Sequence, residues 1–200
     1  MKILLVSDIE DPYLWEFYKP GRLDPYDLIL CAGDLKAEYL TFLVTMSHAQ
    51  VLYIHGNHDE RYAKRPPEGC VCIDDTLVTV CGLRIAGLGG SARYREGPYQ
   101  YTEAEMTRRI RRVNRKVRRA GGVDIVLTHA APKGCGDAEG YAHRGFACFL
   151  PMLDRWKPKY LVHGHVHLQY GVDRLHAYGE TQVVNACQKY VLDWPEEDEE

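Results

Sequence analysis

Residues 51–59, Val51-Leu52-Tyr53-Ile54-His55-Gly56-Asn57-His58-Asp59, join an apolar run directly to a polar turn. Two earlier stretches repeat the pattern: Ile3–Ser7 leads into Asp8-Ile9-Glu10, and Leu28–Ala32 leads into Gly33-Asp34. The apolar residues are continuous and do not alternate with polar ones, which is typical of strands buried on both faces of a parallel sheet. Each run is therefore predicted to be a buried strand that delivers polar side chains to one edge of a sheet.

Segments between and after these runs have the spacing of helices. Lys36–Ser47 places Leu40, Leu43 and Val44 on one helical face, which gives the βαβ order of an α/β domain. Thr102–Arg119 begins with a capping-box sequence and stops at a pair of glycines. We expect this second helix to be amphipathic, with a densely basic outer face.

Further strands are predicted along the rest of the chain: Thr76–Val80 and Arg84–Leu88 as a hairpin, then Ile125–Thr128 and Tyr160–Val162. The end of the chain, Leu168–Asp173, Arg174–Ala177 and Thr181–Ala186, is expected to form a small antiparallel meander. No repeat or composition break divides the sequence. We predict a single domain over residues 1–193, followed by an acidic, disordered tail at residues 194–200.

The bulk composition excludes several classes of protein. A chain of 200 residues with a formal net charge of −3 buries an adequate core and has no global basic field to attract nucleic acid. It lacks an apolar run of about eighteen residues, so no membrane span is expected. The N-terminus is interpreted as a first strand and not as a signal peptide. Its seven scattered cysteines are typical of reduced thiols, which predicts a cytoplasmic protein.

Carboxylate, amide and imidazole side chains follow the predicted strands. Asp8 and Glu10 lie two residues apart, so on an extended segment they point the same way, and the same holds for His165 and His167. Oxygen ligands suit hard divalent cations, and imidazole suits borderline ones. The candidate metal ligands are Asp8, Glu10, Asp34, Asn57, His129, His165 and His167.

Each of these residues also has a purely structural interpretation. A lone aspartate at a strand end, such as Asp34, is often a helix cap or turn former, and a lone His129 is often a core histidine. Gly56-Asn57-His58-Asp59 taken alone could be a turn. Independent turns, however, have no reason to occur in this order behind buried strands, so the combined pattern favours a metal site.

In order and spacing, these motifs resemble the calcineurin-like metallophosphoesterase superfamily. That pattern is Asp-x-His, Gly-Asp, Gly-Asn-His-Asp/Glu, His and Gly-His-x-His, and the match runs from Asp8 to His167. The resemblance implies a four-layer αββα sandwich of two mixed sheets between helices, with a dinuclear metal site at the strand ends. It implies a metal-dependent phosphoesterase in which a metal-bridging hydroxide attacks phosphorus.

The resemblance also implies a role for each site residue. Asp34 bridges two divalent metal ions; Asp8, Glu10 and His167 complete one metal, while Asn57, His129 and His165 complete the other. His58 assists the leaving group as a catalytic residue, and Asp59 is expected to orient its ring.

Glu10 is a departure from the family pattern, which has histidine at this position. A carboxylate still ligates cations, but it makes the site harder, which favours Mn²⁺, Mg²⁺ or iron over zinc. We therefore expect Mn²⁺ as the cofactor. An alternative is that Glu10 binds through water or not at all; the adjacent Asp11 should point the opposite way.

A glycine-rich loop, residues 87–94, is a candidate substrate site. Its glycines permit close approach of the backbone to phosphate, and Arg93 with Tyr94 could contact the substrate. The competing interpretation is a surface loop held by tyrosines.

The leading functional prediction is a small phosphodiester or phosphomonoester as substrate. A catalytically weak scaffold that acts through protein binding is the alternative, and the intact Gly56-Asn57-His58-Asp59 disfavours it. A nucleic-acid partner would use the basic helix at 102–119, but aromatic residues do not interleave with its charges, so a solvated face is the preferred interpretation. The sequence does not predict an oligomeric state.

Overall fold

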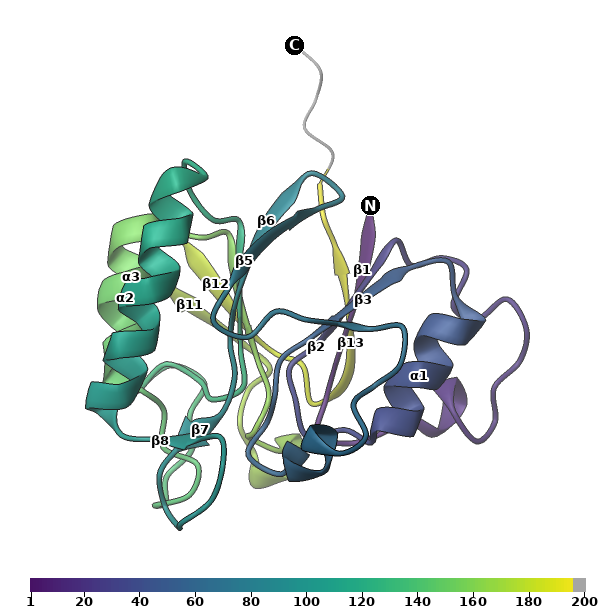
Figure 1. Cartoon of the computed structure of the whole chain (residues 1–200), viewed down its shortest axis with the longest axis horizontal. Coiled ribbons are helices and arrows are strands. Elements are labelled where there is room, and N and C mark those ends of the chain that lie inside the picture. Colours follow the sequence, from purple (N-terminus) through teal and green to yellow (C-terminus); the bar gives the residue numbers. More distant parts are fainter. Residues whose placement is uncertain (196–200) are drawn as a thin grey trace.

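Two β-sheets face each other and carry helices on their outer sides (Figure 1). This computed structural model describes residues 1–195. The first sheet has strand order β13-β1-β2-β3-β4, and the second has the order β11-β12-β10-β9-β6-β5. A separate pair, β7 (Ser91–Ala92) and β8 (Gln100–Tyr101), lies below the second sheet. The predicted four-layer αββα sandwich is confirmed.

The first sheet is parallel except at one edge. Strands β1 (Lys2–Ser7), β2 (Leu28–Cys31), β3 (Gln50–Tyr53) and β4 (Val71–Cys72) run in the same direction, and β13 (Gln188–Asp193) pairs antiparallel with β1. The carboxyl ends of β1, β2 and β3 therefore meet at one edge, as predicted.

The second sheet has a parallel centre between antiparallel edges. Its parallel strands are β6 (Leu83–Leu88), β9 (Ile125–Thr128), β10 (Tyr160–His163) and β12 (Thr181–Asn185). The edge strands are β5 (Leu77–Val80) and β11 (Leu175–Tyr178). The β5–β6 hairpin confirms the expected pairing.

Three helices cover the outer faces of the sheets. Helix α1 (Ala37–Met46) covers the first sheet, while α2 (Glu103–Arg119) and α3 (Leu150–Trp156) cover the second. The predicted capping box is present: Thr102 Oγ1 accepts from the Glu105 amide, and the Glu105 carboxylate accepts from the Thr102 amide. Short 3-10 turns complete the described elements: η1 (Pro12–Leu14), η2 (Asp59–Ala63), η3 (Ala147–Phe149) and η4 (Leu168–Tyr170).

Alternate residues of the central strands enter different cores. On β1, Ile3 and Leu5 face the second sheet, whereas Leu4 and Val6 face α1. A third core lies between the second sheet and α2, which contributes Met106, Ile110, Val113 and Val117 at helical spacing. The central strands β1, β2, β3, β9 and β10 are therefore buried on both faces, which explains their unbroken apolar sequences.

The expected meander at the end of the chain is confirmed only in part: β11 and β12 pair antiparallel, as predicted, but the first expected strand is absent. Residues 168–170 form η4 instead of a strand, β12 joins β10 in parallel, and β13 leaves for the other sheet. The predicted tail boundary also needs correction, because Trp194 packs on the Tyr160 ring and its amide donates to Met1 O. The remaining acidic residues, 196–200, lie outside the described residues.

All seven cysteines are free thiols, and none forms a disulfide. Within residues 1–195, no helix has the length and apolar character needed to cross a membrane.

Candidate metal centre

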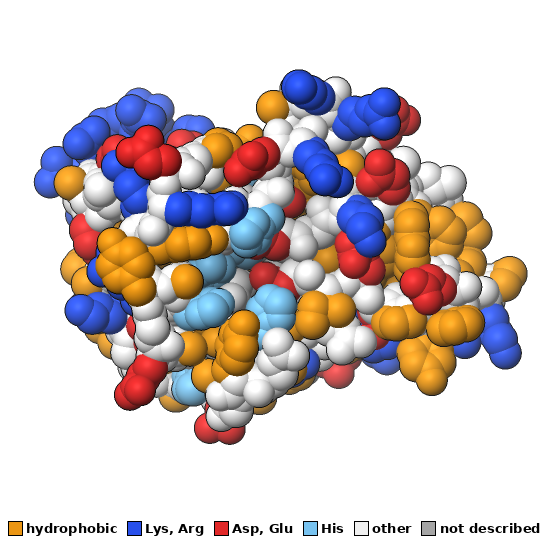
Figure 2. Space-filling view, turned by 90° about the horizontal axis from the view of Figure 1, so that it is seen from below, with side chains coloured by type: hydrophobic (Ala, Val, Ile, Leu, Met, Phe, Trp, Pro, Cys, Tyr) orange, Lys and Arg blue, Asp and Glu red, His pale blue; other side chains and the backbone are white. Residues whose placement is uncertain are grey.

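Five loops carry polar side chains to the same edge of the two sheets. They follow β1, β2 and β3 in the first sheet and β9 and β10 in the second. In the view from below, histidine side chains gather around a hollow with acidic side chains within it (Figure 2). Glycines allow this close approach: an added Cβ on Gly56 would overlap the Asp34 carboxylate, and one on Gly33 would overlap the Gly56 backbone.

The centre of the site is formed by Asp34, His129 and His165. One ligand atom from each lies within 4.8 Å of the others. His129 Nε2 lies 3.2 Å from Asp34 Oδ2 and 3.0 Å from Asn57 Oδ1. His129 Nδ1 lies 2.6 Å from Ala32 O, so Nδ1 carries a proton and Nε2 faces the carboxylate and the amide oxygen. That is the orientation in which a histidine presents Nε2 to a metal ion.

His165 is held by two contacts on opposite sides. Its Nε2 lies 2.7 Å from Ala142 O, which leaves Nδ1 as the ligand atom. Its backbone amide donates to both oxygens of Asp8, at 3.1 and 2.9 Å. Burial lowers the pKa of His165 to about 3, so this ring is neutral, as a metal ligand must be.

Asp34 and His129 shift each other's pKa in opposite directions. Burial raises the pKa of Asp34, but the charge and hydrogen bond of His129 outweigh it and lower the pKa to about 2. Burial likewise lowers the pKa of His129, but Asp34 reverses this and raises it to about 9. The Asp34 carboxylate is thus anionic and the His129 ring beside it is protonated; a metal ion bound at Nε2 would replace that proton.

Three of the predicted ligands have left-handed backbone conformations. Asp8 has φ 63°, Asp34 has φ 58° and His165 has φ 66°. Such conformations are uncommon for residues other than glycine, and they cluster at functional sites because surrounding contacts must hold them. Here Asp8 N donates to Gly33 O, and Asp34 N donates to Asp59 Oδ2.

Three predicted ligands, Asp8, Glu10 and His167, lie outside the central group of three. The Glu10 carboxylate accepts from the Lys36 amide at 3.2 Å and lies 3.6 Å from Lys36 Nζ. His167 is half-buried, with its ring 5.7 Å from that of Tyr170. Asp11 points away from the site to Lys189, 3.1 Å away, as expected. Metal ligation by Glu10 and His167 stays a prediction.

The expected role of Asp59 is wrong. Its carboxylate is buried and accepts from the amides of Gly56 at 2.7 Å and Asp34 at 2.9 Å, so it does not contact the His58 ring. Burial, reinforced by the nearby charge of Asp34, raises the pKa of Asp59 to about 6. Asp59 therefore braces the two loops. Their unpaired buried amides needed an acceptor, a requirement that the motif alone does not reveal.

A residue that the sequence did not select contacts His58 instead. Arg95 Nη2 lies 3.2 Å from His58 Nδ1, and His58 is exposed. Arginine has only donors, so this contact assigns the proton of the neutral imidazole to Nε2. The His58 amide donates to Asp34 Oδ1 at 2.7 Å, which anchors the residue at the metal site.

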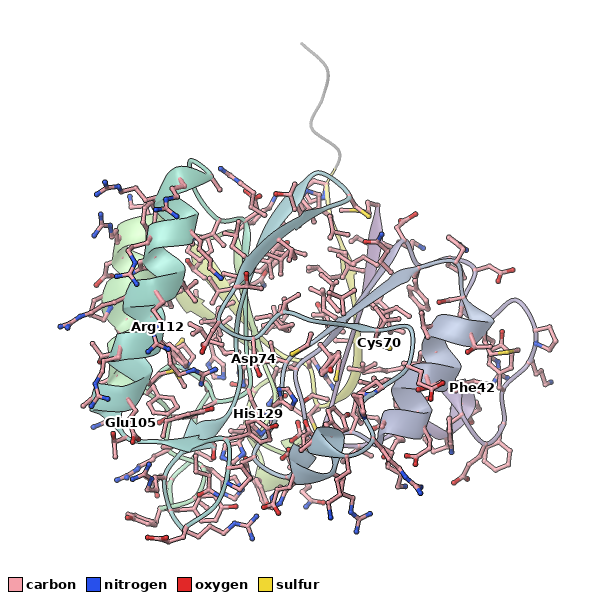
Figure 3. All side chains as sticks on the ribbon, viewed as in Figure 1. Phe42, Cys70, Asp74, Glu105, Arg112 and His129 are labelled. Atoms are coloured by element: carbon pink, nitrogen blue, oxygen red, sulfur yellow. The ribbon has the colours of Figure 1, made fainter. Side chains whose placement is uncertain are left out.

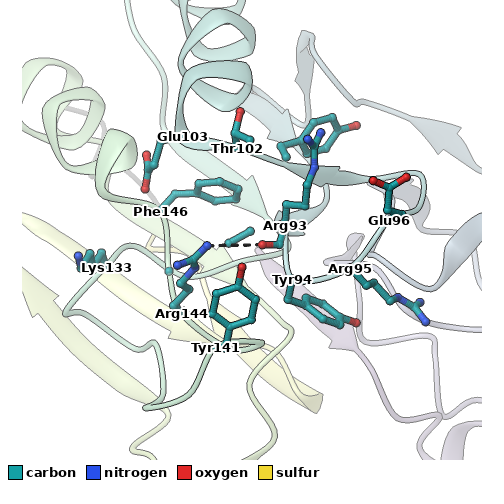
Figure 4. A pocket seen from close by; sticks show the side chains of 13 residues that line it. Arg93, Tyr94, Arg95, Glu96, Thr102, Glu103, Lys133, Tyr141, Arg144 and Phe146 are labelled. Carbon is teal, nitrogen blue, oxygen red and sulfur yellow. Dashed lines mark hydrogen bonds between the residues drawn. The ribbon is translucent and has the colours of Figure 1, made fainter.

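A pocket of about 540 Å³ adjoins the centre (Figure 4). Tyr94 connects the two, because its hydroxyl accepts from Asn57 Nδ2 at 3.1 Å. Arg93 also lines the pocket, but its guanidinium is paired with Glu105 at 2.8 Å. Arg144 and Tyr141 also line the pocket; the Arg144 guanidinium lies 4.6 Å from the Tyr141 ring centre and donates to Arg93 O at 3.4 Å. A second cavity of about 720 Å³ lies on the other side of His58 and is lined by Asp34, Lys36 and Arg61.

A second group of ligand-type side chains has a structural explanation. The Asp74 carboxylate lies 2.6 Å from His55 Nδ1, accepts from Gly89 N at 2.6 Å, and lies 3.5 Å from Arg109. Cys72 is the third member of the group. These contacts tie β3 to the loop after β6. The group is a brace beside the metal centre, with its carboxylate already satisfied.

The residues present fit a divalent metal centre. Carboxylate, amide oxygen and imidazole donors converge, both histidines leave one nitrogen available, and their other nitrogens are fixed by backbone carbonyls.

Comparison with known proteins identifies the family of this chain. Residues 1–169 match the family of calcineurin-like phosphoesterases, and the chain belongs to that family. Its members use divalent metals and hydrolyse phosphoesters.

Among curated proteins, a UPF0046 protein of Caenorhabditis elegans is 41% identical over 217 residues, covering 86% of this chain and 53% of its own length. A second UPF0046 protein of that organism is 39% identical over 71 residues, covering 32% of this chain and 24% of its own. The chain thus spans about half the length or less of these relatives.

A crystal structure of a Thermus thermophilus protein has a TM-score of 0.66 at 18% identity, covering 93% of this chain and 88% of that one. Another crystal structure has a TM-score of 0.70 at 15% identity, covering 96% and 94%. Both are similar in fold.

Proposed function

We propose that this protein is a dinuclear metal-dependent hydrolase of small phosphodiesters or phosphomonoesters. The observation that carries the proposal is the convergence of Asp34, His129 and His165 beside an exposed His58. Two bound divalent cations would neutralise phosphate charge and lower the pKa of water enough to supply a nucleophile at neutral pH.

The residues described above would hold the two cations. Asp34 lies nearest the centre and is the residue best placed to bridge two cations, with Asn57, His129 and His165 around one of them. Asp8 and, through movement away from Lys36, Glu10 would complete the other, together with His167. Because Asp8 and Glu10 supply oxygen ligands, this second group of ligands favours Mn²⁺ over zinc.

His58 is the candidate acid for the leaving group. It lies outside the three-residue group, it lines the cavity of about 720 Å³, and Arg95 assigns the proton of the neutral ring to Nε2. A positioned general acid contributes about 10²–10⁴-fold in rate. To donate a proton to the departing alkoxide, His58 must first be protonated at Nδ1, which requires Arg95 to move from its 3.2 Å contact. Tyr94 and Arg144 line the space for the rest of the substrate.

The test is turnover after metal removal and restoration. Protein stripped with chelator would be assayed on bis-p-nitrophenyl phosphate and p-nitrophenyl phosphate, before and after addition of Mn²⁺. Metal-dependent hydrolysis is the expected result, and the ratio of the two rates distinguishes diesterase from monoesterase.

The contact between Glu10 and Lys36 favours one competing function, a scaffold that binds metal weakly and acts through protein partners. Absence of turnover on both substrates, with metal content verified by elemental analysis, would support the scaffold and contradict the enzyme.

A further inference from the structure

Six arginines form one exposed face of α2, which we call the α2 arginine face. All six side chains are exposed, and none makes a hydrogen bond or ion pair with any residue in the described part of the chain. Arg112, labelled in Figure 3, points away from the body of the molecule. The members of the face are Arg108, Arg111, Arg112, Arg115, Arg118 and Arg119.

Several basic residues elsewhere in the described chain are paired with carboxylates, whereas none of these six is. Arg84 pairs with Asp124, Arg93 with Glu105 and Lys189 with Asp11. Even on α2, the buried Arg109 pairs with Asp75 at 2.7 Å. The net charge of the whole chain is −3, so the face is a local cationic surface on an acidic protein.

Like charges at this spacing disfavour the helix itself. Arg111 and Arg115 are four residues apart, and Arg115 and Arg118 are three apart, so their charges repel on adjacent turns. A solvated helix face normally mixes both signs of charge. Here no carboxylate lies among the residues that line a shallow depression of about 360 Å³ between α2 and α3: Arg111, Asn114, Arg115, Arg118, Arg119 and Arg155.

We propose that the α2 arginine face binds the sugar-phosphate backbone of duplex nucleic acid. Guanidinium groups bind phosphate oxygens through paired hydrogen bonds, whereas lysine acts as a point charge. From Arg108 to Arg119 the helix rises about 16 Å, and the major groove of a DNA duplex is about 12 Å wide. The α2 arginine face is thus long enough to contact phosphates on both sides of the major groove.

The surroundings of the face disfavour other polyanionic partners. A helix that lies in a membrane surface buries its apolar face in lipid, but Ile110 and Val113 are already buried against the second sheet. No exposed large hydrophobic side chain belongs to α2 or α3 among the described residues. Single strands are bound by stacking on aromatic rings. Helix α2 has none, and the neighbouring Trp156 of α3 is only partly exposed and already contacts Asn114 and Arg155.

Binding would be independent of the metal centre, because the face lies on the outer side of α2 while the centre lies at the edge between the sheets. The assay is fluorescence anisotropy of a labelled DNA duplex of about two helical turns. Chelator would prevent cleavage of the probe. We expect the logarithm of the affinity to fall linearly with the logarithm of salt concentration, by about 0.9 per phosphate contact.

The variant Arg111→Gln/Arg115→Gln is expected to weaken binding about tenfold at low salt and to reduce the salt slope by about 2. The matched control, Lys2→Gln/Lys19→Gln, removes the same charge from exposed positions outside α2 and should bind as the unmodified protein does. Both variants should keep metal-dependent phosphoesterase turnover and the far-ultraviolet circular dichroism of the unmodified protein.

Three outcomes would overturn the proposal: no duplex binding by the unmodified protein at low salt, an equal loss in the control, or binding to phosphatidylserine vesicles at least as strong as to the duplex. The third would assign the face to a membrane surface.

Discussion

His58 and Asp34 are neighbours through a single hydrogen bond, from the His58 amide to Asp34 Oδ1, yet they have different expected roles. Asp34 is expected to hold metal at the centre, where it faces His129, while the His58 ring lies outside it beside Arg95. These different roles predict different effects of substitution. A change at His58 should slow the chemical step, whereas a change at Asp34 should weaken metal binding.

His58→Ala should lower kcat by about 10²–10⁴-fold, because the leaving group loses its proton donor. Metal content, measured by elemental analysis, should stay at the level of the unmodified protein. His48→Ala, at an exposed histidine after α1, is the matched control and should retain full activity. Equal metal loss in the His58 variant would contradict its position outside the metal shells.

Asp34→Asn should strip the protein of metal. The amide has one donor end, so it cannot accept from His58 N, face His129 and bridge cations with the oxygens of a carboxylate. Elemental analysis after dialysis should find less than half of the metal bound by the unmodified protein. Asp24→Asn, at an exposed aspartate, is the control. Two metals per chain in the Asp34 variant would exclude a bridging role.

At the scale of elements, an ion pair with several hydrogen bonds joins β6 to the start of β9 in the second sheet. Arg84 on β6 contacts Asp124, directly before β9, through Nε at 2.9 Å and Nη2 at 2.6 Å, and the Arg84 amide donates to the same carboxylate at 2.7 Å. Burial raises the pKa of Asp124, but these bonds from Arg84 outweigh it and lower the pKa.

Asp124→Asn should therefore lower the free energy of unfolding by roughly 1–2 kcal/mol at pH 7. The pKa is lower in the folded state than in the unfolded state. The stabilisation is accordingly present above about pH 4 and is lost as pH falls through the folded pKa. Denaturant titrations across this range should show a weaker dependence on pH in the variant. An unchanged acid transition would contradict the prediction.

Elements with strong local signals were predictable from sequence. The capping box at Thr102 and the apolar runs before Asp8, Asp34 and Asn57 each specify their structure within about ten residues. Helix α3 was not predicted, because Leu150–Trp156 is short and contains Pro151, so its apolar spacing is too brief to recognise. The path of β13 to the first sheet was also missed, because its pairing with β1 joins residues that are distant in sequence.

The same limit applies to the candidate site. Ligand types and order follow from the motifs, but the partners of individual atoms depend on the folded loops. The Asp59 carboxylate accepts hydrogen bonds from two backbone amides and does not contact the His58 ring, and the Glu10 carboxylate accepts from the Lys36 amide. These contacts are set by unpaired donors at strand and helix ends, and a motif does not specify them.

For the whole molecule, the candidate metal centre is a cross-link between the two sheets. Asp34 and Asn57 follow strands of the first sheet, and His129 and His165 follow strands of the second. A cation held by residues from both sheets opposes their separation, so its binding energy is added to the stability of the sandwich.

Chelation should therefore lower the melting temperature of the protein. At a free metal concentration of 100 times Kd, the expected stabilisation is about 2.7 kcal/mol, and it should rise with the logarithm of metal concentration. Differential scanning calorimetry with and without Mn²⁺ would measure it. The Asp34→Asn variant should melt at one temperature under both conditions. A shift in that variant equal to the shift in the unmodified protein would place the stabilising metal elsewhere.

Met1 and Trp194 are joined at the edge of the sandwich opposite the candidate site, where the Trp194 amide donates to Met1 O. A linker attached near either position therefore leaves the molecule on the side away from the hollow. Protein immobilised on a bead or electrode through such a linker would present its metal centre outward to the passing solution. The protein is therefore suited to assays on a surface, in which the metal and the substrate are exchanged by changing the solution that flows over it.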